Sequence, residues 1–294
     1  MADLGPRVVA IGGGHGLATV LTAVRRYAGA ITAVVTVADD GGSSGRLRRD
    51  LGVPPPGDLR RALVALADSE RVWTRAFEHR VAGGDLRGHA VGNLVLAALT
   101  EDRGDFEQAL DAAGALLGAA GSVLPATVDP VDLTARIDGR FVAGQVAVAT
   151  ATGRIERVAL APGDARAPDR AVREIAAADQ VVLAPGSLFT SLLAAAVVPG
   201  IRDALAMTAG RVVLVGNVCP DVETSGMTAA DHVAAVLGHG VRVDAYLAPE
   251  GGRVPLDRSA VEVLGPVVVE APAGDPTLGV HDPRGLASAL GGLL

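Results

Sequence analysis

A glycine-rich run, residues 12–16, stands between an aliphatic stretch and a helix-like stretch from Leu17, where it could hold an anion. Glycine reaches positive φ at such a strand-to-helix turn, and the free N–H groups at a helix start attract phosphate. The third glycine of the dinucleotide fingerprint would fall at Leu17, so a tight turn that needs glycine only for its geometry is the alternative. The candidate residues of this run are Gly12, Gly13, Gly14, His15 and Gly16.

A second candidate is the string 39–46, which directly follows another buried aliphatic stretch. Its two adjacent carboxylates could hold Mg²⁺ or act as a base, and the Gly-Gly-Ser-Ser-Gly turn offers backbone amides and two hydroxyls to an anion. The alternative is that both aspartates only cap a glycine-rich loop through Asx-type hydrogen bonds. The candidate residues of this string are Asp39, Asp40, Ser43, Ser44 and Arg46.

Two segments further along carry polar residues at expected helix starts. Asp58 is predicted to cap a helix whose first turn holds Arg60 and Arg61, and arginine there is unfavourable against the helix dipole unless an anion lies nearby. His89 and Asn93 share one face if their helix begins by residue 88, and they could contact a base, a ribose or a phosphate. A capping or surface role for the histidine is the alternative.

The stretch 184–191 repeats the strand, turn and helix order of the opening run. Gly186 and Ser187 form its turn, so it is a further anion-binding candidate, with a simple N-cap as the alternative. Asn217 follows the aliphatic run 211–215 and could meet a ligand or form a left-handed turn.

Several reaction classes are excluded by residue types. The chain has 26 arginines and no lysine. P-loop NTPases and Schiff-base enzymes both need a lysine, so these two classes are excluded. Phosphate recognition must then rest on arginine and on backbone amides. Cys219 precedes Pro220 without an obvious base, so a nucleophilic hydrolase is not expected. Histidines other than His89 show no metal-ligand spacing.

Composition narrows the partners and the compartment. The net charge of −7 argues against nucleic acid and anionic membrane surfaces, and aromatic residues, the platforms on which bases stack, make up only 2% of the chain. The lone Cys219 and the acidic start at Asp3 predict a cytoplasmic protein without internal disulfides. Residues 180–201 carry no charge, but Pro-Gly pairs divide them into a short buried strand and a helix, so no membrane insertion is expected.

The elements that must position these residues alternate between strand and helix. Strands buried on both faces are predicted because the aliphatic runs do not alternate with polar residues, and interspersed helices then imply a parallel sheet with helices on both faces. The predicted strands are 7–11, 31–38, 180–184, 211–215, 241–247 and 266–270, and the predicted helices are 17–27, 171–178, 228–238 and 283–294.

Two regions break this alternation. Residues 58–117 read as consecutive helices, a layer over one mouth of the sheet, and residues 123–160 read as a small antiparallel element. Its expected strands are 131–137, 141–149 and 154–160. We therefore predict an α/β fold in which residues 1–294 form one domain with a helical and a small β insertion.

Taken together, these motifs resemble one known family. The segments 12–17, 35–48, 55–60, 88–94 and 184–188 closely resemble those of the gluconeogenesis factors, the YvcK-like proteins, whose relatives are the 2-phospho-L-lactate transferases (CofD-like) of deazaflavin cofactor synthesis. The similarity runs from Arg7 to the closing His281-Asp282-Pro283, and the Asp-Asp-Gly-Gly-Ser-Ser-Gly-Arg string is highly specific. His15 stands where most members have threonine, and residues 252–255 and Val280 depart from the usual C-terminal pattern.

The resemblance implies a Rossmann-like core, a cytoplasmic location and binding of a UDP-sugar such as UDP-N-acetylglucosamine or UDP-glucose. It also implies a role in cell-wall synthesis and cell shape on gluconeogenic carbon sources. We expect a regulator that acts through a protein partner and forms a homo-oligomer. The alternative is a Mg²⁺-dependent phosphotransferase like the deazaflavin relatives, in which Asp40 and Asp58 are the candidate catalytic residues and metal ligands. No cofactor is predicted for the regulator, and Mg²⁺ is the candidate cofactor of the alternative.

Overall fold

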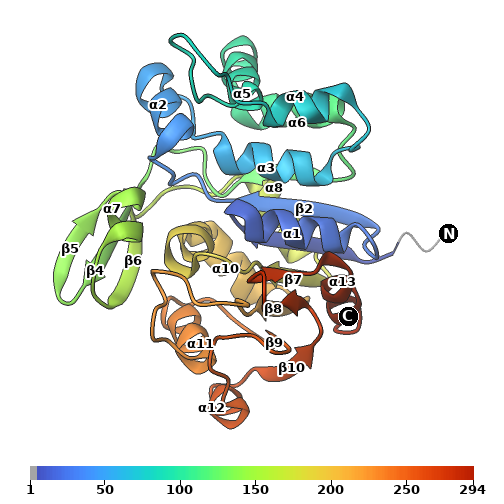
Figure 1. Cartoon of the computed structure of the whole chain (residues 1–294), viewed down its shortest axis with the longest axis vertical. Coiled ribbons are helices and arrows are strands. Elements are labelled where there is room, and N and C mark those ends of the chain that lie inside the picture. The colour runs from blue at the N-terminus through green and yellow to red at the C-terminus, as the bar shows by residue number, and fades with distance from the viewer. Residues whose placement is uncertain (1–4) are drawn as a thin grey trace.

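The computed structural model describes residues 5–294, and its centre is a seven-stranded parallel sheet (Figure 1). The strand order is β10-β9-β8-β7-β1-β2-β3. All its pairings are parallel, as expected for aliphatic strands buried on both faces. The strands are β1 (Arg7–Gly12), β2 (Ala30–Val35), β3 (Ser122–Pro125), β7 (Gln180–Leu183), β8 (Arg211–Val215), β9 (Ala245–Pro249) and β10 (Val267–Ala271).

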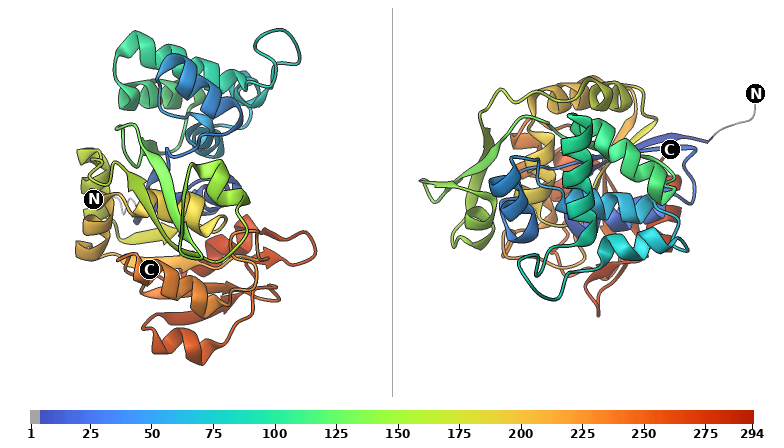
Figure 2. Two further views of the ribbon diagram at one scale, coloured as in Figure 1. Left: turned by 90° about the vertical axis from the view of Figure 1, so that its left-hand side faces the viewer. Right: turned by 90° about the horizontal axis from the view of Figure 1, so that it is seen from above.

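Helices cover both faces of this sheet, which confirms the predicted fold class. Figures 1 and 2 show α1 and α13 on one side and α8 and α10 on the other, and contacts between α1 and α13 and between α8 and α10 join each pair. Flanking the sheet are α1 (Gly14–Val24), α8 (Asp169–Ala176), the π-helix η1 (Leu188–Leu193), α9 (Ala194–Ala196), α10 (Pro199–Met207), α11 (Ala229–Gly238), α12 (Arg258–Val263) and α13 (Pro283–Gly291).

The predicted helical layer lies along the β2–β3 edge of the sheet, where α3 and α6 pack against β3, and it begins earlier than expected (Figure 1). Residues 42–51, expected to start as a glycine-rich turn, form a helix of their own. The layer consists of α2 (Gly42–Leu51), α3 (Gly57–Leu66), α4 (Val72–Glu78), α5 (Val91–Arg103) and α6 (Phe106–Leu117). The N-cap of α3 is Pro56, so the prediction that Asp58 caps it is wrong, and Asp58 instead lies in the first turn.

The small antiparallel element is confirmed with two corrections. A three-stranded sheet of order β5-β4-β6 is built from β4 (Asp132–Ile137), β5 (Arg140–Ala143) and β6 (Ile155–Ala161). Residues 123–125, predicted to belong to it, lie instead in β3 of the large sheet. The predicted strand 141–149 stops at Gly144, whose φ is +99°, and continues as helix α7 (Gln145–Thr150). A two-stranded ribbon of β11 (Gly274–Asp275) and β12 (Val280–His281) lies near the carboxyl end.

Within residues 5–294, no single helix is both long and apolar enough to cross a bilayer. Leu188–Ala196 and Pro199–Met207, joined at a bend of 77°, meet that length and composition requirement only as a pair. The acidic start at Asp3 lies outside the described residues. The assignment of residues 1–294 to one domain stays a prediction.

Candidate functional site

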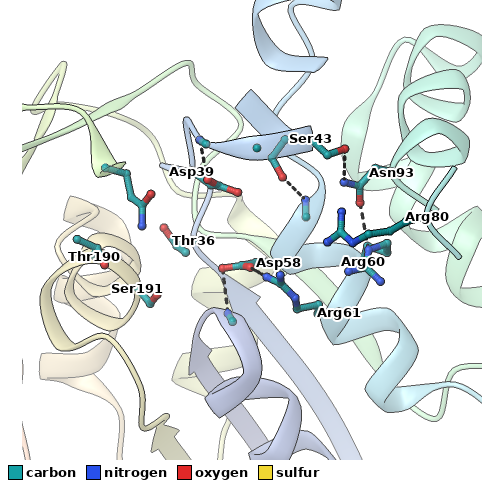
Figure 3. Close-up of a pocket in the computed structure, with 16 residues that line it drawn as sticks. Thr36, Asp39, Ser43, Asp58, Arg60, Arg61, Arg80, Asn93, Thr190 and Ser191 are labelled. Carbon is teal, nitrogen blue, oxygen red and sulfur yellow. Dashed lines mark hydrogen bonds and ion pairs between the residues drawn. The ribbon is translucent and has the colours of Figure 1, made fainter. Parts of the chain in front are cut away.

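A cavity of about 400 Å³ opens where β1, β2 and β7 end, beneath the helical layer (Figure 3). In the sheet, β1 has β2 as its neighbour on one side and β7 on the other, so the strand order reverses between β1 and β7. Open α/β sheets bind ligands at such a reversal point. The lining residues are Gly14, Thr36, Asp39, Gly41, Gly42, Ser43, Ser44, Gly57, Asp58, Arg60, Arg61, Arg80, Asn93, Gln145, Thr190 and Ser191.

The first turn of α2 forms one wall of this cavity. Its N-cap is Gly41, which donates its N–H to Asp39 Oδ1 at 2.9 Å and supplies no side chain to cap the helix. In the described part of the chain, the N–H groups of Gly42, Ser43 and Ser44 have no hydrogen-bond acceptor. These amides therefore remain available to an anion in the cavity.

Ser43 brings together two residues that the sequence placed on one helix face. The Nδ1 atom of His89 lies 2.9 Å from Ser43 Oγ, and the Nδ2 atom of Asn93 lies 3.0 Å from it. The helix begins at Val91, so His89 precedes it and the assumption of a shared helix face is wrong. Residues 80 and 90 pair as a short antiparallel bridge directly before this helix, and the two side chains meet at Ser43.

Three guanidinium groups face the cavity from the helical layer (Figure 3). Arg60 is only 5% exposed, and its Nε donates to Asn93 Oδ1 at 3.1 Å. Arg61 pairs with Asp58 at 2.6 Å, and Arg80 donates to the carbonyl of Gly88 at 2.9 Å. Burial, reinforced by Arg61 and Arg80, lowers the pKa of Arg60 to about 10. Among residues 5–294 neither Arg60 nor Arg80 forms an ion pair, so both retain charge for a ligand.

The carboxylates in the cavity are Asp39 and Asp58, not the predicted pair of Asp40 and Asp58. Both oxygens of Asp40 turn away and accept the N–H groups of Gln145 and Val146, each at 3.0 Å, which caps α7. Burial raises the pKa of Asp39, and the charges of Asp58 and Asp40 raise it further, while hydrogen bonds to Gly41 and Ser44 lower it.

Whether these groups suit Mg²⁺ can be judged from the donor set. Mg²⁺ in enzymes is typically held by one or two carboxylates, with phosphate and water oxygens completing the octahedron. Asp39 and Asp58 meet that requirement, although each already accepts hydrogen bonds. The described residues contain no cluster of three or more His, Cys, Asp or Glu side chains that could hold a metal. The site therefore fits Mg²⁺ that arrives with a phosphate, held by Asp39 and Asp58.

The opening glycine run contributes little to this cavity. Only Gly14 lines it, and its N–H already donates to Asp58 Oδ2 at 2.9 Å. A Cβ added to Gly16 would overlap the carbonyl oxygen of Pro185, so this glycine permits two backbone segments to touch. Gly12 and Gly13 likewise pack closely, against Ala184 and against Asp58 with Thr36. The close packing favours the alternative in which these glycines serve geometry.

His15 borders a neighbouring cavity of about 500 Å³ instead. This second cavity also touches Thr19, Thr22 and Pro283, and it shares Arg60, Arg61 and Arg80 with the first. The three guanidinium groups thus border both cavities. A ligand with a phosphate near these arginines could extend into either side.

The remaining predicted residues lie outside both cavity linings. Asn217 and Gly186 bind each other, through Gly186 N to Asn217 Oδ1 at 2.7 Å and Asn217 Nδ2 to Gly186 O at 2.9 Å. Ser187 is the N-cap of η1 without a side-chain capping bond, and Arg46 donates to the carbonyl of Arg87 at 2.9 Å. A role for these four residues in ligand binding stays a prediction.

Nine lining residues were not among the site residues predicted from the sequence: Thr36, Gly41, Gly42, Gly57, Arg61, Arg80, Gln145, Thr190 and Ser191. Thr36 directly follows β2, a position at which ligands are expected in this kind of sheet, so its place in the chain could have indicated it. Arg80 and Gln145 had no such signal, because tertiary contacts alone bring them to the cavity.

Comparison with known proteins places the chain in a family. A model of the family described as 2-phospho-L-lactate transferase CofD matches residues 8–271. The structure superposes with a TM-score of 0.89 on the crystal structure of a UPF0052 family member from Bacillus halodurans, which is 36% identical and is matched over 96% of this chain and 97% of that one. The chain belongs to the CofD/UPF0052 family.

Its curated relatives carry a functional name. The gluconeogenesis factor of Bacillus subtilis (strain 168) is 43% identical over 80% of this chain and 75% of its own length. A protein of Mycobacterium tuberculosis (strain ATCC 25618 / H37Rv), which bears the same name provisionally, is 44% identical over 97% of this chain and 90% of its own length. The resemblance stated from the motifs is confirmed, and this CofD/UPF0052 chain is a member of the gluconeogenesis factor family.

Proposed function

We propose that this chain binds a nucleotide sugar, UDP-N-acetylglucosamine or UDP-glucose, in the cavity above β1, β2 and β7. The observation that carries the proposal is Arg60, a nearly buried guanidinium without an ion pair among residues 5–294. A buried charge is costly unless a counter-charge accompanies it, and the unbonded amides of α2 face the same cavity. A diphosphate supplies that counter-charge.

The dimensions of the two cavities suit a ligand with two bulky ends. Cavities of about 400 and 500 Å³ meet at Arg60, Arg61 and Arg80, and small-molecule sites usually span about 300–1,000 Å³. A diphosphate at the arginines would leave one cavity for the sugar and the other for the nucleoside. Arginine is suited to this task because its planar fork binds phosphate oxygens in pairs.

The cellular part of the proposal rests on the family. We propose that the liganded protein regulates cell-wall synthesis and cell shape on gluconeogenic carbon sources, in the cytoplasm, as a homo-oligomer and through a protein partner. The test is complementation of a Bacillus subtilis strain that lacks its gluconeogenesis factor, scored by growth and cell shape on a gluconeogenic carbon source. Full rescue by a variant that no longer binds nucleotide sugars would argue against ligand-dependent regulation.

The binding proposal is tested by thermal shift and calorimetry with a millimolar panel of UDP-sugars, UDP, GDP and inorganic phosphate. A ligand that binds only the folded state raises the melting temperature, by an amount that grows with its concentration over Kd. We expect UDP-sugars to give the largest shift. A panel without any shift, alongside a control protein that responds to its own nucleotide, would refute nucleotide-sugar binding.

A second candidate function is favoured by the pair of carboxylates in the cavity. Asp39 and Asp58 could hold Mg²⁺ against a diphosphate, as a phosphotransferase resembling the 2-phospho-L-lactate transferases would require. The residues would orient the donor, and Mg²⁺, when bound, would offset charge on the phosphate oxygens. Product formation from a nucleotide-linked donor and an acceptor that needs both Mg²⁺ and Asp39 would favour this enzyme over the regulator.

A further inference from the structure

The hydroxyl of Ser43 lies at the wall of the cavity between an imidazole and an amide. His89 Nδ1 is 2.9 Å from Ser43 Oγ, and Asn93 Nδ2 is 3.0 Å from it. His89 is 6% exposed and Asn93 3%, whereas Ser43 is half-buried and open to the cavity. Figure 3 shows Asn93 bridging Ser43 and Arg60. Two buried side chains thus hold one accessible hydroxyl.

The donors and acceptors of this cluster limit where the hydroxyl proton can go. Arg60 Nε can only donate, so the Asn93 oxygen, 3.1 Å away, must face it and the Asn93 NH₂ group must face Ser43. Ser43 Oγ therefore accepts a hydrogen bond from Asn93. Of the two groups that contact the hydroxyl, only His89 Nδ1 can accept its proton, which requires the imidazole to carry its own proton on Nε2.

The surroundings of His89 favour the neutral form of its imidazole and fix its backbone. Burial lowers the pKa of His89, and the nearby Arg46 guanidinium lowers it further, while Asp50 acts in the opposite direction. The backbone of His89 is held on both sides, by its N–H to Leu86 O at 3.0 Å and its carbonyl to Val81 N at 2.9 Å. A neutral, oriented imidazole bonded to a hydroxyl has the arrangement of a general base and its nucleophile.

We propose that Ser43 is a nucleophile activated by His89 and directed at the phosphorus of a phosphoric anhydride or activated phosphate ester. The idea rests on the proposed function in one respect, since the same arginines would hold the phosphoryl oxygens. Ser43 Oγ forms a bond to phosphorus while the bond from phosphorus to the leaving group breaks. The leaving group departs with the bonding electron pair, and the hydroxyl proton moves to His89 Nδ1. Arg60, Arg80 and the α2 amides offset charge on the phosphoryl oxygens.

The test treats the full chain with an alkyl fluorophosphonate, whose leaving group is fluoride, and follows labelling by intact mass and peptide mapping. We expect one label on Ser43 and none in Ser43→Ala. Ser259 is a matched control, because its hydroxyl is exposed but donates to a carboxylate, Asp257 Oδ1 at 2.7 Å, and it should stay unlabelled. His89→Gln should slow labelling about a hundredfold or more, the usual contribution of a general base. The wild-type rate should rise with pH and level off above the pKa of His89.

Three labelling results would overturn the proposed role of Ser43. A label on another residue, no label at all, or an equal rate in His89→Gln excludes the activated serine. Melting temperatures verify that the variants are folded, and His89→Asn replaces His89→Gln if the latter does not fold. Calorimetry with UDP-N-acetylglucosamine on the same preparations separates the two proposals. Binding without labelling overturns the nucleophile alone, whereas labelling without binding overturns the nucleotide-sugar site alone. Bound nucleotide sugar should also slow labelling.

Discussion

Two glycine-rich turns at the carboxyl ends of neighbouring strands look alike in sequence but differ in the structure. The turn between β1 and α1 is closed, because Asp58 accepts the N–H of Gly14 and Gly16 packs on the backbone of Pro185. The turn between β2 and α2 is open, because the N–H groups of residues 42–44 find no acceptor within the described chain. Glycine content therefore predicts the turn, and the acceptor of its amides decides whether a ligand can bind there.

A third turn, between β7 and η1, extends the comparison. Glu223 accepts the N–H groups of Phe189 and Thr190 at 3.1 and 3.2 Å, and the hydroxyl of Thr190 also donates to it. This turn is closed by a carboxylate from a distant loop, as the first is closed by Asp58. Of the three turns, the one after β2 is thus left for an external anion, and the arginines of α3 and Arg80 face that same turn.

The largest effect is expected from a substitution that disrupts the closed turn between β1 and α1. Gly16→Ala should lower the melting temperature by on the order of 10 °C, because its Cβ would overlap a backbone carbonyl that cannot move without disturbing β7 and η1. Gly42→Ala in the open turn is the matched control. Gly42 has φ +48° and open space around it, so alanine costs only the left-handed strain of roughly 1–2 kcal/mol. Equal losses of stability in the two variants, measured by calorimetry, would contradict the distinction between the turns.

The next effect concerns ligand affinity at the open turn. Arg80→Ala should weaken nucleotide-sugar binding roughly ten- to hundredfold, the usual worth of one charge-assisted contact to phosphate. Arg75→Ala is the matched control, an exposed arginine on α4 that lines neither cavity. Arg46→Ala tests the role predicted for Arg46 from the sequence, because its guanidinium binds the carbonyl of Arg87 and lines neither cavity; an affinity like that of the Arg75 variant would remove Arg46 from the site. Isothermal calorimetry measures all three, and unchanged Kd in Arg80→Ala would remove Arg80 from the site.

Much of the fold was accessible from the sequence because its strands are buried on both faces. Continuous aliphatic runs predict such strands directly, and six of the seven strands in the large sheet were predicted, with shifts of a few residues at their ends. β3 was missed because its four residues, Ser122–Pro125, are too few to show a period. The region of α7 reads as a strand in Phe141-Val142 and Val146-Ala147-Val148. A carboxylate 105 residues away, that of Asp40, caps it as a helix.

The site was less accessible, because its chemistry depends on pairs that are distant in the chain. The sequence singled out Asp39, Ser43, Asp58, Arg60 and Asn93, and all five line the cavity. The sequence could not indicate which of the two adjacent aspartates faces the cavity. Adjacent residues in an extended chain point in opposite directions, so either Asp39 or Asp40 could have faced the ligand. Ser43 stands at the centre of the Gly-x-Ser-x-Gly pentapeptide 41–45, but the imidazole that contacts its hydroxyl comes from His89, 46 residues away, and no linear motif indicates that pair.

A smaller effect separates the two neighbouring aspartates. Asp39→Asn should reduce the gain in ligand affinity that Mg²⁺ provides, because Asp39 faces the cavity and Mg²⁺ prefers charged oxygen ligands. Asp40→Asn should leave that gain unchanged and cost about 1 kcal/mol of stability, since an amide caps α7 with one acceptor and no charge. Ligand titrations of both variants with and without Mg²⁺ measure the gain in affinity, and melting temperatures measure the loss of stability. If Asp40→Asn alone abolished the Mg²⁺ effect, the original assignment of Asp40 as a ligand would be right.

The smallest expected effect tests the third turn through pH. Burial raises the pKa of Glu223 above its usual value, although the hydrogen bonds from Thr190 and Phe189 oppose the shift. Between the unfolded pKa and the raised folded pKa, the folded state binds more protons, so stability falls as pH rises through this window and is then level. Glu223→Gln keeps an oxygen acceptor for the η1 amides but cannot titrate. The melting temperature of this variant should therefore stay within a few degrees of the wild type at pH 7. It should not show the fall with rising pH that the titration of Glu223 causes in the wild type. Thermal unfolding from pH 4 to pH 8 measures both curves. A wild-type curve that rises through the same window, or a variant that keeps the fall, would show that burial does not control this carboxylate.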